Sequence, residues 1–218
     1  MKVLNFTFHG IGEPPADVGD SERRVWVSRP DFHSALDFIA EHDHMRVTVD
    51  DGNQSDVEIV LPALLERGLS GSFFVVADRI GRPGYLDAAD LHALRDAGME
   101  VGLHGMKHRR WRHLSKRTLD EEMGEARHIL ETHLGAPIAT AACPFGSYDR
   151  SSLSELRRGG FTRVFTSDGG YASTDWWLQP RTTLRAGSDV DVVERIAEHA
   201  GRPIAKLSRL KTLVKRNL

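Results

Sequence analysis

Residues 46–52 read Arg-Val-Thr-Val-Asp-Asp-Gly, a short apolar run that ends in two acids and a glycine. The length of the run and its β-branched residues are typical of a buried strand. Six similar runs occur elsewhere in the chain. The seven predicted strands are Val3–Phe8, Arg46–Val49, Ser72–Val76, Glu100–Leu103, Ala139–Ala142, Arg163–Thr166 and Arg181–Leu184.

Helical spacing of apolar residues separates most of these strands. Phe32, Leu36 and Ile39 recur after Pro30-Asp31, which favours a helix start, and a second periodic segment ends near Gly68. The predicted helices further along are Ala88–Ala97, Thr118–Leu134, Ser151–Arg158 and Asp189–Ala200. Helices that alternate with short buried strands predict an α/β fold with parallel strands and right-handed crossovers.

The composition is that of an ordinary globular protein. The chain has 218 residues, of which 40% are hydrophobic and 28% charged, enough for one sizeable domain. No apolar run approaches the roughly 18 residues of a membrane span, and the first residues lack the features of a secretory signal. The single cysteine, Cys143, excludes an internal disulfide framework, so we expect a cytoplasmic protein.

Charge divides the chain into a predicted domain at 1–201 and a tail at 202–218. The tail has six basic residues and no acidic one, whereas residues 1–201 hold 23 basic and 31 acidic side chains, a net charge of −8. An acidic body argues against a nucleic-acid partner. Apolar and basic residues alternate in the tail at helical spacing. This pattern suits weak peripheral contact with the inner face of a membrane, or a terminal helix packed on the domain.

Polar or turn-forming residues follow five of the predicted strands at their carboxyl ends. In a parallel α/β barrel the reactive groups lie on the loops at this end. The segments concerned are His9, Asp50-Asp51-Gly52, His104, Pro144-Phe145-Gly146 and Ser167-Asp168-Gly169. The remaining long segment without periodicity, Gly10–Arg29, is predicted to be a loop over one face.

His104 and His108 are spaced as metal ligands often are. In a helical turn, residues four apart place both imidazoles on one side, and a carboxylate from Asp50-Asp51 would complete a three-ligand site. Gly52 permits a sharp turn that could bring both acids into one pocket. On spacing alone, loop histidines and a solvated Asp-Gly turn remain alternatives.

Three segments together resemble the polysaccharide deacetylase family, the NodB-homology domain of carbohydrate esterase family 4. They are Thr48-Val49-Asp50-Asp51-Gly52, His104-Gly105-Met106-Lys107-His108 and Ala142-Cys143-Pro144-Phe145-Gly146. The resemblance covers roughly Asp31 to Leu184. It implies a distorted (β/α)7 barrel, which agrees with the seven strands read from the sequence.

The resemblance also implies a metal-dependent hydrolase that removes an N-acetyl group from an amino sugar in a poly- or oligosaccharide or its biosynthetic precursor. Asp51, His104 and His108 match the metal ligands, and Asp50 matches the base that takes a proton from metal-bound water. The backbone N–H of Phe145 matches the oxyanion donor. Zinc is usual in the family, but the ligand set also suits Co2+, Ni2+ or Fe2+.

The chain departs from the family pattern at three points. Gly105 stands where Ser or Thr is usual, and Ala142 replaces the arginine that normally orients the base. Arg181 is a candidate replacement for that guanidinium. The late Leu-x-His segment that carries the usual general acid is absent. The missing arginine and histidine leave open a catalytically impaired, carbohydrate-binding relative.

His9 is the first candidate for the missing general acid. It resembles the Tyr/Phe-His of permuted family members, and a barrel places its first and last strands side by side. His113 and His199 are alternatives, as is a structural role for His9 in the rim. A phosphohydrolase of the HD type, suggested by His42-Asp43, conflicts with seven predicted strands because that fold is all-helical.

Two further features are predicted to face the substrate. The basic run around Arg109–Arg112 either binds an acidic group or is a solvated loop. Trp176 and Trp177 offer a stacking surface for a sugar ring, or are simply buried. The acyl group, the glycan and the oligomeric state are not determined by the sequence.

Overall fold

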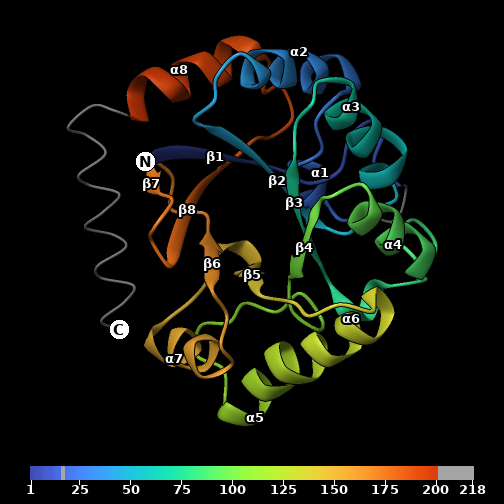
Figure 1. Cartoon of the computed structure of the whole chain (residues 1–218), viewed down its shortest axis with the longest axis vertical. Helices are drawn as coiled ribbons and strands as arrows, with labels where there is room; N and C mark the ends of the chain where they lie inside the picture. Colours follow the sequence, from blue (N-terminus) through green and yellow to red (C-terminus); the bar gives the residue numbers. More distant parts are fainter. Residues whose placement is uncertain (16–17, 201–218) are drawn as a thin grey trace.

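Seven parallel strands close into a barrel in this computed structural model, which describes residues 1–15 and 18–200 (Figure 1). The strands follow the order β1 to β6 and then β8, which pairs back with β1. Their bounds are β1 (Lys2–Phe8), β2 (Met45–Asp51), β3 (Gly71–Val75), β4 (Glu100–Leu103), β5 (Thr140–Ala142), β6 (Arg163–Thr166) and β8 (Leu178–Thr183). The predicted (β/α)7 barrel is confirmed, which excludes the all-helical alternative.

The register at the closure aligns residues that matter for the site. Thr7 of β1 lies opposite Thr48 of β2, and Asn5 of β1 lies opposite Arg181 of β8. All seven predicted strands overlap observed ones, although β8 begins three residues earlier than predicted. The sequence analysis missed β7 (Ala172–Ser173), which pairs antiparallel with the start of β1, because two residues carry no periodicity.

Helices surround the barrel on its outer side (Figure 1). The longer ones are α2 (Arg29–Ala40), α3 (Leu61–Glu66), α4 (Ala88–Asp96), α6 (Ala126–Leu134), α7 (Arg150–Arg158) and α8 (Val190–Ala200). The short segments are α1 (Asp20–Arg23), α5 (Lys116–Leu119), η1 (Asp56–Val60), η2 (Ala77–Arg79), η3 (Asp120–Glu125) and η4 (Pro144–Gly146). In α2, Ser28 caps the helix by accepting from the Asp31 N–H, and Phe32, Leu36 and Ile39 are buried as their spacing predicts.

The helix predicted at 118–134 is continuous in space but not uniform. It starts at Lys116, passes through the π-helical η3 and continues as α6. Gly135 ends it with a left-handed φ of 67°, the conformation that glycine adopts at helix ends without strain. The π-helical segment widens the helix around Glu122, which is buried. The geometry of a loop in the site depends on this residue.

The segment Gly10–Arg29 is largely a loop, as predicted, but it contains α1. It is tied down by the Val27 N–H, which donates to Gly10 O, and by the close packing of Trp26 on Gly10. A Cβ placed on Gly10 would lie 2.1 Å from Trp26 Cε2, so only glycine fits here. This contact fixes the chain directly after the end of β1.

Most of the apolar core lies between the barrel and its helices, whereas much of the barrel interior is polar. A small separate cluster of Phe74, Ala142 and Phe165 packs beside the guanidinium of Arg181, which is fully buried. A buried charge of this kind needs a partner of opposite sign. Its partner, Asp50, belongs to the site.

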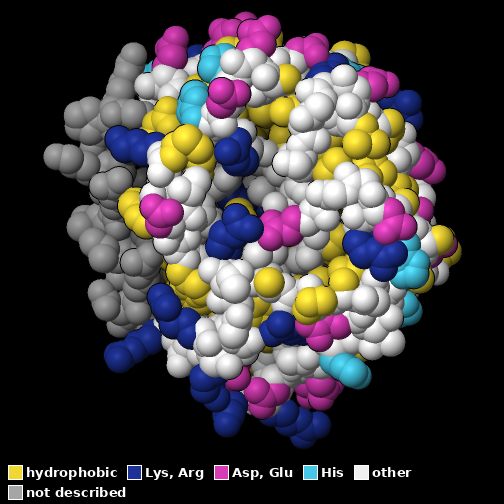
Figure 2. All heavy atoms as spheres, in the orientation of Figure 1, with side chains coloured by type: hydrophobic (Ala, Val, Ile, Leu, Met, Phe, Trp, Pro, Cys, Tyr) yellow, Lys and Arg dark blue, Asp and Glu magenta, His cyan; other side chains and the backbone are white. Residues whose placement is uncertain are grey.

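The surface in Figure 2 mixes both signs of charge, with acidic side chains gathered over α2 and α8. Within the described residues, no helix is both long and apolar enough to cross a membrane. The predicted tail at 202–218 lies outside the described residues. Its membrane contact and the cytoplasmic location therefore stay predictions.

Candidate functional site

The carboxyl ends of the barrel strands bring the predicted polar residues together. His9 follows β1, Asp50 and Asp51 end β2, and His104 follows β4. Asp50 and Asp51 share one pocket although neighbours in a strand normally point apart, because the backbone turns at Asp51 with φ 86°. Asp50 Oδ2 and Asp51 Oδ1 each lie 3.7 Å from His104 Nε2, so both acids reach the same histidine.

Asp51, His104 and His108 form a compact group of donor atoms. Asp51 Oδ1 lies 3.3 Å from His108 Nε2 and 3.7 Å from His104 Nε2, and the three donor atoms lie within 4.8 Å of one another. Two ligands held about 2.1 Å from a tetrahedral ion are about 3.4 Å apart. Asp51 Oδ1 and His108 Nε2 are buried and have no hydrogen-bond partner among the described residues. The group therefore fits a divalent cation.

The loop between the two histidines is not helical, so the predicted helical turn is wrong. His104 and His108 lie outside any helix, and the chain reverses through left-handed backbone at Gly105 (φ 84°) and His108 (φ 55°). Their rings nevertheless converge, with centroids 4.9 Å apart. A local turn stabilised from outside the loop produces the proximity that helix periodicity would have given.

Glu122 supplies that stabilisation and was missed in the sequence. Its carboxylate, 1% exposed, accepts hydrogen bonds from the backbone N–H groups of Met106 (3.1 Å) and Lys107 (3.2 Å). A signal was present, because Glu122 falls three residues after Leu119 and four before Ala126, both on the buried face of the helix. A carboxylate at such a position needs donors.

The imidazoles are held neutral and oriented. His104 Nδ1 donates to Ala142 O at 2.9 Å, which leaves Nε2 facing the two aspartates. Burial lowers the pKa of His104 to about 4 and also lowers the pKa of His108. Near neutral pH both rings can therefore present a lone pair to a cation.

Arg181 forms a paired contact with Asp50. Its Nη1 and Nη2 donate to the two carboxylate oxygens at 2.6 and 2.7 Å, and Nη1 also donates to Thr48 Oγ1 at 3.2 Å. Burial alone would raise the pKa of Asp50, but the charge of Arg181, helped by His104, outweighs it and lowers the pKa to about 2. Asp50 is therefore ionised throughout the neutral range.

His9 is the predicted general-acid candidate that lies in this cluster. Its Nε2 is 4.0 Å from Asp50 Oδ2, and the side chain is 15% exposed. His113 has a 72% exposed side chain beside Asp149, and His199 lies on α8 with its Nδ1 bonded to Arg195 O. Neither alternative has a described contact with the two aspartates.

Two more charged residues reach the group without having been predicted. Arg79 Nη1 lies 3.5 Å from Asp51 Oδ1, and Arg79 Nη2 lies 3.1 Å from Glu22 Oε1. Glu22, from α1, is in turn 3.9 Å from His108 Nδ1. The loop over the barrel thus brings one acid to the edge of the site, a position that no local pattern in 10–29 indicates.

Comparison with known proteins decides the family. Residues 40–164, more than half of the chain, match the family model described as polysaccharide deacetylase. The chain belongs to the polysaccharide deacetylase family. YxkH of Bacillus subtilis (strain 168), whose name places it among polysaccharide deacetylases, is 21% identical over 129 residues, which are 59% of this chain and 46% of YxkH. The aligned region thus spans about half the length of that relative.

Solved structures of low sequence identity share the fold. The Streptococcus pyogenes deacetylase PplD, in complex with acetate, superposes with a TM-score of 0.79 at 15% identity and covers 90% of this chain and 98% of PplD. IcaB from Ammonifex degensii gives a TM-score of 0.71 at 21% identity, covering 92% and 97% of the two chains. The chain therefore shares its barrel fold with PplD and IcaB.

Two departures of this chain from the family pattern have structural reasons. A Cβ on Gly105 would lie 2.6 Å from Glu122 Oε2, so the usual Ser or Thr has no room. Ala142 is fully buried in the barrel beside Phe74, and the Arg181 guanidinium lies 5.2 Å from the Phe74 ring. The guanidinium thus comes from β8 and not from β5.

Phe145 lies beside the candidate metal triad of Asp51, His104 and His108. It is in η4 with a left-handed φ of 58°, and its ring centroid is 4.3 Å from that of His108. The aromatic pair Trp176 and Trp177, by contrast, directly precedes β8 at the amino end of the barrel, and Trp177 Nε1 donates to Phe161 O. The predicted sugar-stacking role of this pair at the site is therefore wrong.

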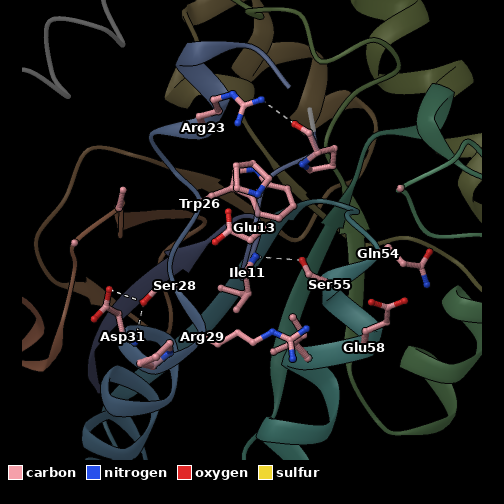
Figure 3. Close-up of a pocket in the computed structure, with 18 residues that line it drawn as sticks. Ile11, Glu13, Arg23, Trp26, Ser28, Arg29, Asp31, Gln54, Ser55 and Glu58 are labelled. Atoms are coloured by element: carbon pink, nitrogen blue, oxygen red, sulfur yellow. Dashed lines mark hydrogen bonds between the residues drawn. The ribbon is translucent and has the colours of Figure 1, made fainter. Parts of the chain in front are cut away.

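A cavity of about 750 Å3 lies beside the loop that follows β1 (Figure 3). Arg23, at the end of α1, and Trp26, in the α1–α2 connection, line one side of it, and Gln54 and Glu58, just before and within η1, line the other. None of the three metal-triad residues lines it. Two of its lining residues are close in sequence to residues of the site: Arg23 follows Glu22, and Ile11 lies two residues after His9.

Proposed function

We propose that this polysaccharide deacetylase is a metal-dependent hydrolase that removes an N-acetyl group from an amino sugar in a poly- or oligosaccharide or its precursor. One observation carries the proposal. The donor atoms of Asp51, His104 and His108 lie within 4.8 Å of one another, Asp51 Oδ1 and His108 Nε2 have no hydrogen-bond partner among the described residues, and the ionised Asp50 lies 3.7 Å from His104 Nε2.

Asp51, His104 and His108 would hold the cation, and zinc is the ion we expect, with Co2+, Ni2+ and Fe2+ as alternatives. When bound, a divalent cation supplies Lewis acidity, which polarises the acetamide carbonyl and makes water more acidic. One acid and two neutral imidazoles are the donors that catalytic sites of this kind use.

Asp50 would take the proton from the attacking water. Its carboxylate is already ionised, and Arg181 fixes its orientation through two hydrogen bonds. A base held in one position avoids the loss of rotational freedom in the transition state. Arg181 therefore acts as a positioning residue through Asp50.

His9 would donate a proton to the departing amine, because it lies 4.0 Å from Asp50 on the rim. The backbone N–H of Phe145 would donate to the oxyanion that forms when water adds to the carbonyl. The acetamide would thus meet a base and an acid that lie next to each other on the rim.

The catalytically impaired alternative rested on the missing arginine and late histidine. Arg181 and His9 each lie next to Asp50, which supports the enzyme over the binding relative. Both an active enzyme and a binding relative could hold a cation, so only a measurement of turnover distinguishes the two.

The test is acetate release from N-acetylated chito-oligosaccharides by the metal-loaded full chain. We expect Asp50→Ala to keep the metal and lose acetate release, and His104→Ala to lose both. His9→Gln should lower kcat by about tenfold to a thousandfold. His128→Ala, an exposed histidine on α6, is the matched control and should behave as wild type. Wild-type rates in both Asp50→Ala and His104→Ala would contradict the proposal.

A further inference from the structure

A chain of stacked side chains leads from the candidate metal triad to the rim. The ring centroids of His108 and Phe145 are 4.3 Å apart, and the Arg110 guanidinium carbon lies 4.4 Å from the Phe145 centroid. Phe145 is 47% exposed and Arg110 is exposed. The guanidinium is therefore held at the open side of the site, over a ring that itself touches a proposed ligand.

The platform under Arg110 is rigid. Phe145 lies between the buried residues Pro144 and Gly146, and a Cβ on Gly146 would lie 2.7 Å from Ser167 Cβ. Close packing on both sides of Phe145 restricts its movement. A cation stacked on such a ring loses less freedom when it binds a ligand than one on a mobile side chain.

The local charge is strongly positive in an otherwise acidic body. Residues 107–112 contain Lys107, Arg109, Arg110 and Arg112 and no acid, whereas residues 1–201 have a net charge of −8. Arg109 lies 3.8 Å from the buried Glu122. Arg110 forms no ion pair with any carboxylate of the described residues, so its charge is available to a ligand.

We propose that Arg110 binds an anionic group, a carboxylate or a phosphate, on the sugar next to the one that is deacetylated. The enzyme would then select acidic glycans over neutral ones. This rests on the proposed deacetylase function, because it names the substrate class of the same site. The planar guanidinium can donate two parallel hydrogen bonds to either oxyanion, a match that lysine lacks.

A solvated basic loop is the competing explanation, and Arg117 on α5 shows what one looks like. Its side chain is 91% exposed, pairs with Glu121 four residues on, and has no aromatic platform. Arg110 is also exposed, but it has no ion pair with a carboxylate of the described residues and it stacks on Phe145. Arg117→Gln, which removes the same charge from the same basic region, is therefore the matched control.

The test compares three disaccharides of similar size with the metal-loaded full chain. One is neutral N,N′-diacetylchitobiose, one carries a lactyl carboxylate, and one carries a phosphate. The measured quantity is the ratio of kcat/KM for each anionic substrate to that for the neutral one. We expect a ratio of about five or more for at least one anion, and the two anionic arms distinguish carboxylate from phosphate.

In Arg110→Gln this ratio should fall to about one, Arg110→Lys should keep part of it, and Arg117→Gln should keep the wild-type value. Raising NaCl from about 0.05 to 0.5 M should lower the wild-type ratio. Equal rates for all three substrates, an unchanged ratio in Arg110→Gln, or an equal loss in Arg117→Gln would overturn the proposal.

A binding measurement keeps this test separate from that of the deacetylase function. Calorimetry with the metal-loaded Asp50→Asn variant compares the affinities for the neutral and anionic disaccharides without turnover. Tighter anion binding that is lost when Arg110→Gln is added supports the inference even if no acetate is released. Acetate release with no anion preference in either assay would overturn the inference and leave the deacetylase function intact.

Discussion

The guanidinium of Arg181 donates to both carboxylate oxygens of Asp50, at 2.6 and 2.7 Å, although 131 residues separate them. Both groups are almost fully buried, and the contact joins β8 to β2, the two strands that flank β1 in the barrel. Each charge therefore depends on the other. Removal of one partner leaves an uncompensated charge in a water-poor interior.

Arg181→Gln should therefore lower the free energy of unfolding by about 3–5 kcal/mol. The double variant Arg181→Gln with Asp50→Asn should be more stable than Arg181→Gln alone, because neither charge remains. Urea denaturation of wild type, Arg181→Gln, Asp50→Asn and the double variant gives the values. If the two single losses simply add in the double variant, the pair does not act as a unit.

Gly105→Ser, which restores the residue usual in the family, should destabilise this chain. Its Cβ would clash with Glu122 Oε2 at 2.6 Å, and its backbone would be held at a left-handed φ of 84°. We expect a loss of about 1–3 kcal/mol in unfolding free energy. Gly124→Ser, at a position with open space around it, is the control. A melting temperature equal to wild type for Gly105→Ser would contradict this account.

Glu122→Gln should weaken zinc binding without touching a ligand. The amide has one acceptor oxygen in place of two, so it cannot serve the Met106 and Lys107 N–H groups as Glu122 does. An affinity loss of about tenfold to a hundredfold is expected, as for other groups that orient metal ligands. Competition with a chromophoric chelator measures it.

Glu121→Gln, at the adjacent and more exposed carboxylate, is the control for the zinc experiment. It should bind zinc as wild type does. If Glu122→Gln also retains the wild-type dissociation constant, Glu122 does not position the loop.

The metal-free protein should lose stability as the pH falls from about 6.5 to about 4. Burial lowers the pKa of His104 to about 4 from 6.5, so in this window the unfolded chain binds a proton that the folded chain does not. The unfolding free energy then rises with pH, by about 3 kcal/mol over the window for this group. Denaturation of the chelator-treated protein at several pH values measures the slope.

His104→Gln should flatten that slope, because the replacement has no proton to gain. His108 contributes in the same direction, since burial also lowers its pKa, so part of the slope should persist. A slope that is identical in His104→Gln and wild type would mean that His104 is not buried in its neutral form.

The fold was predictable because its signals are local. Alternating strands and helices gave the barrel, and Gly68, at φ 64°, lies after α3 where a helix was expected to end. The strand β7 escaped because two residues are too few for a pattern. The start of β8 was missed because Gln179 and Pro180 do not resemble the apolar residues of a buried strand. Gln179 fits in the barrel because it accepts a hydrogen bond from another polar residue, Asn5.

The site was predictable where strand order alone placed residues together, as for Asp51 and His104. Residues that depend on long-range packing were not. Glu22 and Arg79 reach the site from a loop and from η2, and no periodicity encodes their approach. The 104–108 turn was mistaken for a helix because a buried carboxylate 14 residues beyond His108 determines its shape.

The metal content of the purified full chain tests the central claim most directly. After dialysis against zinc, wild type and Asp50→Asn should each retain about one ion per chain, as expected for a single three-ligand site, and His104→Ala should retain none. One ion retained in His104→Ala, or none in wild type, would contradict a cation held by Asp51, His104 and His108.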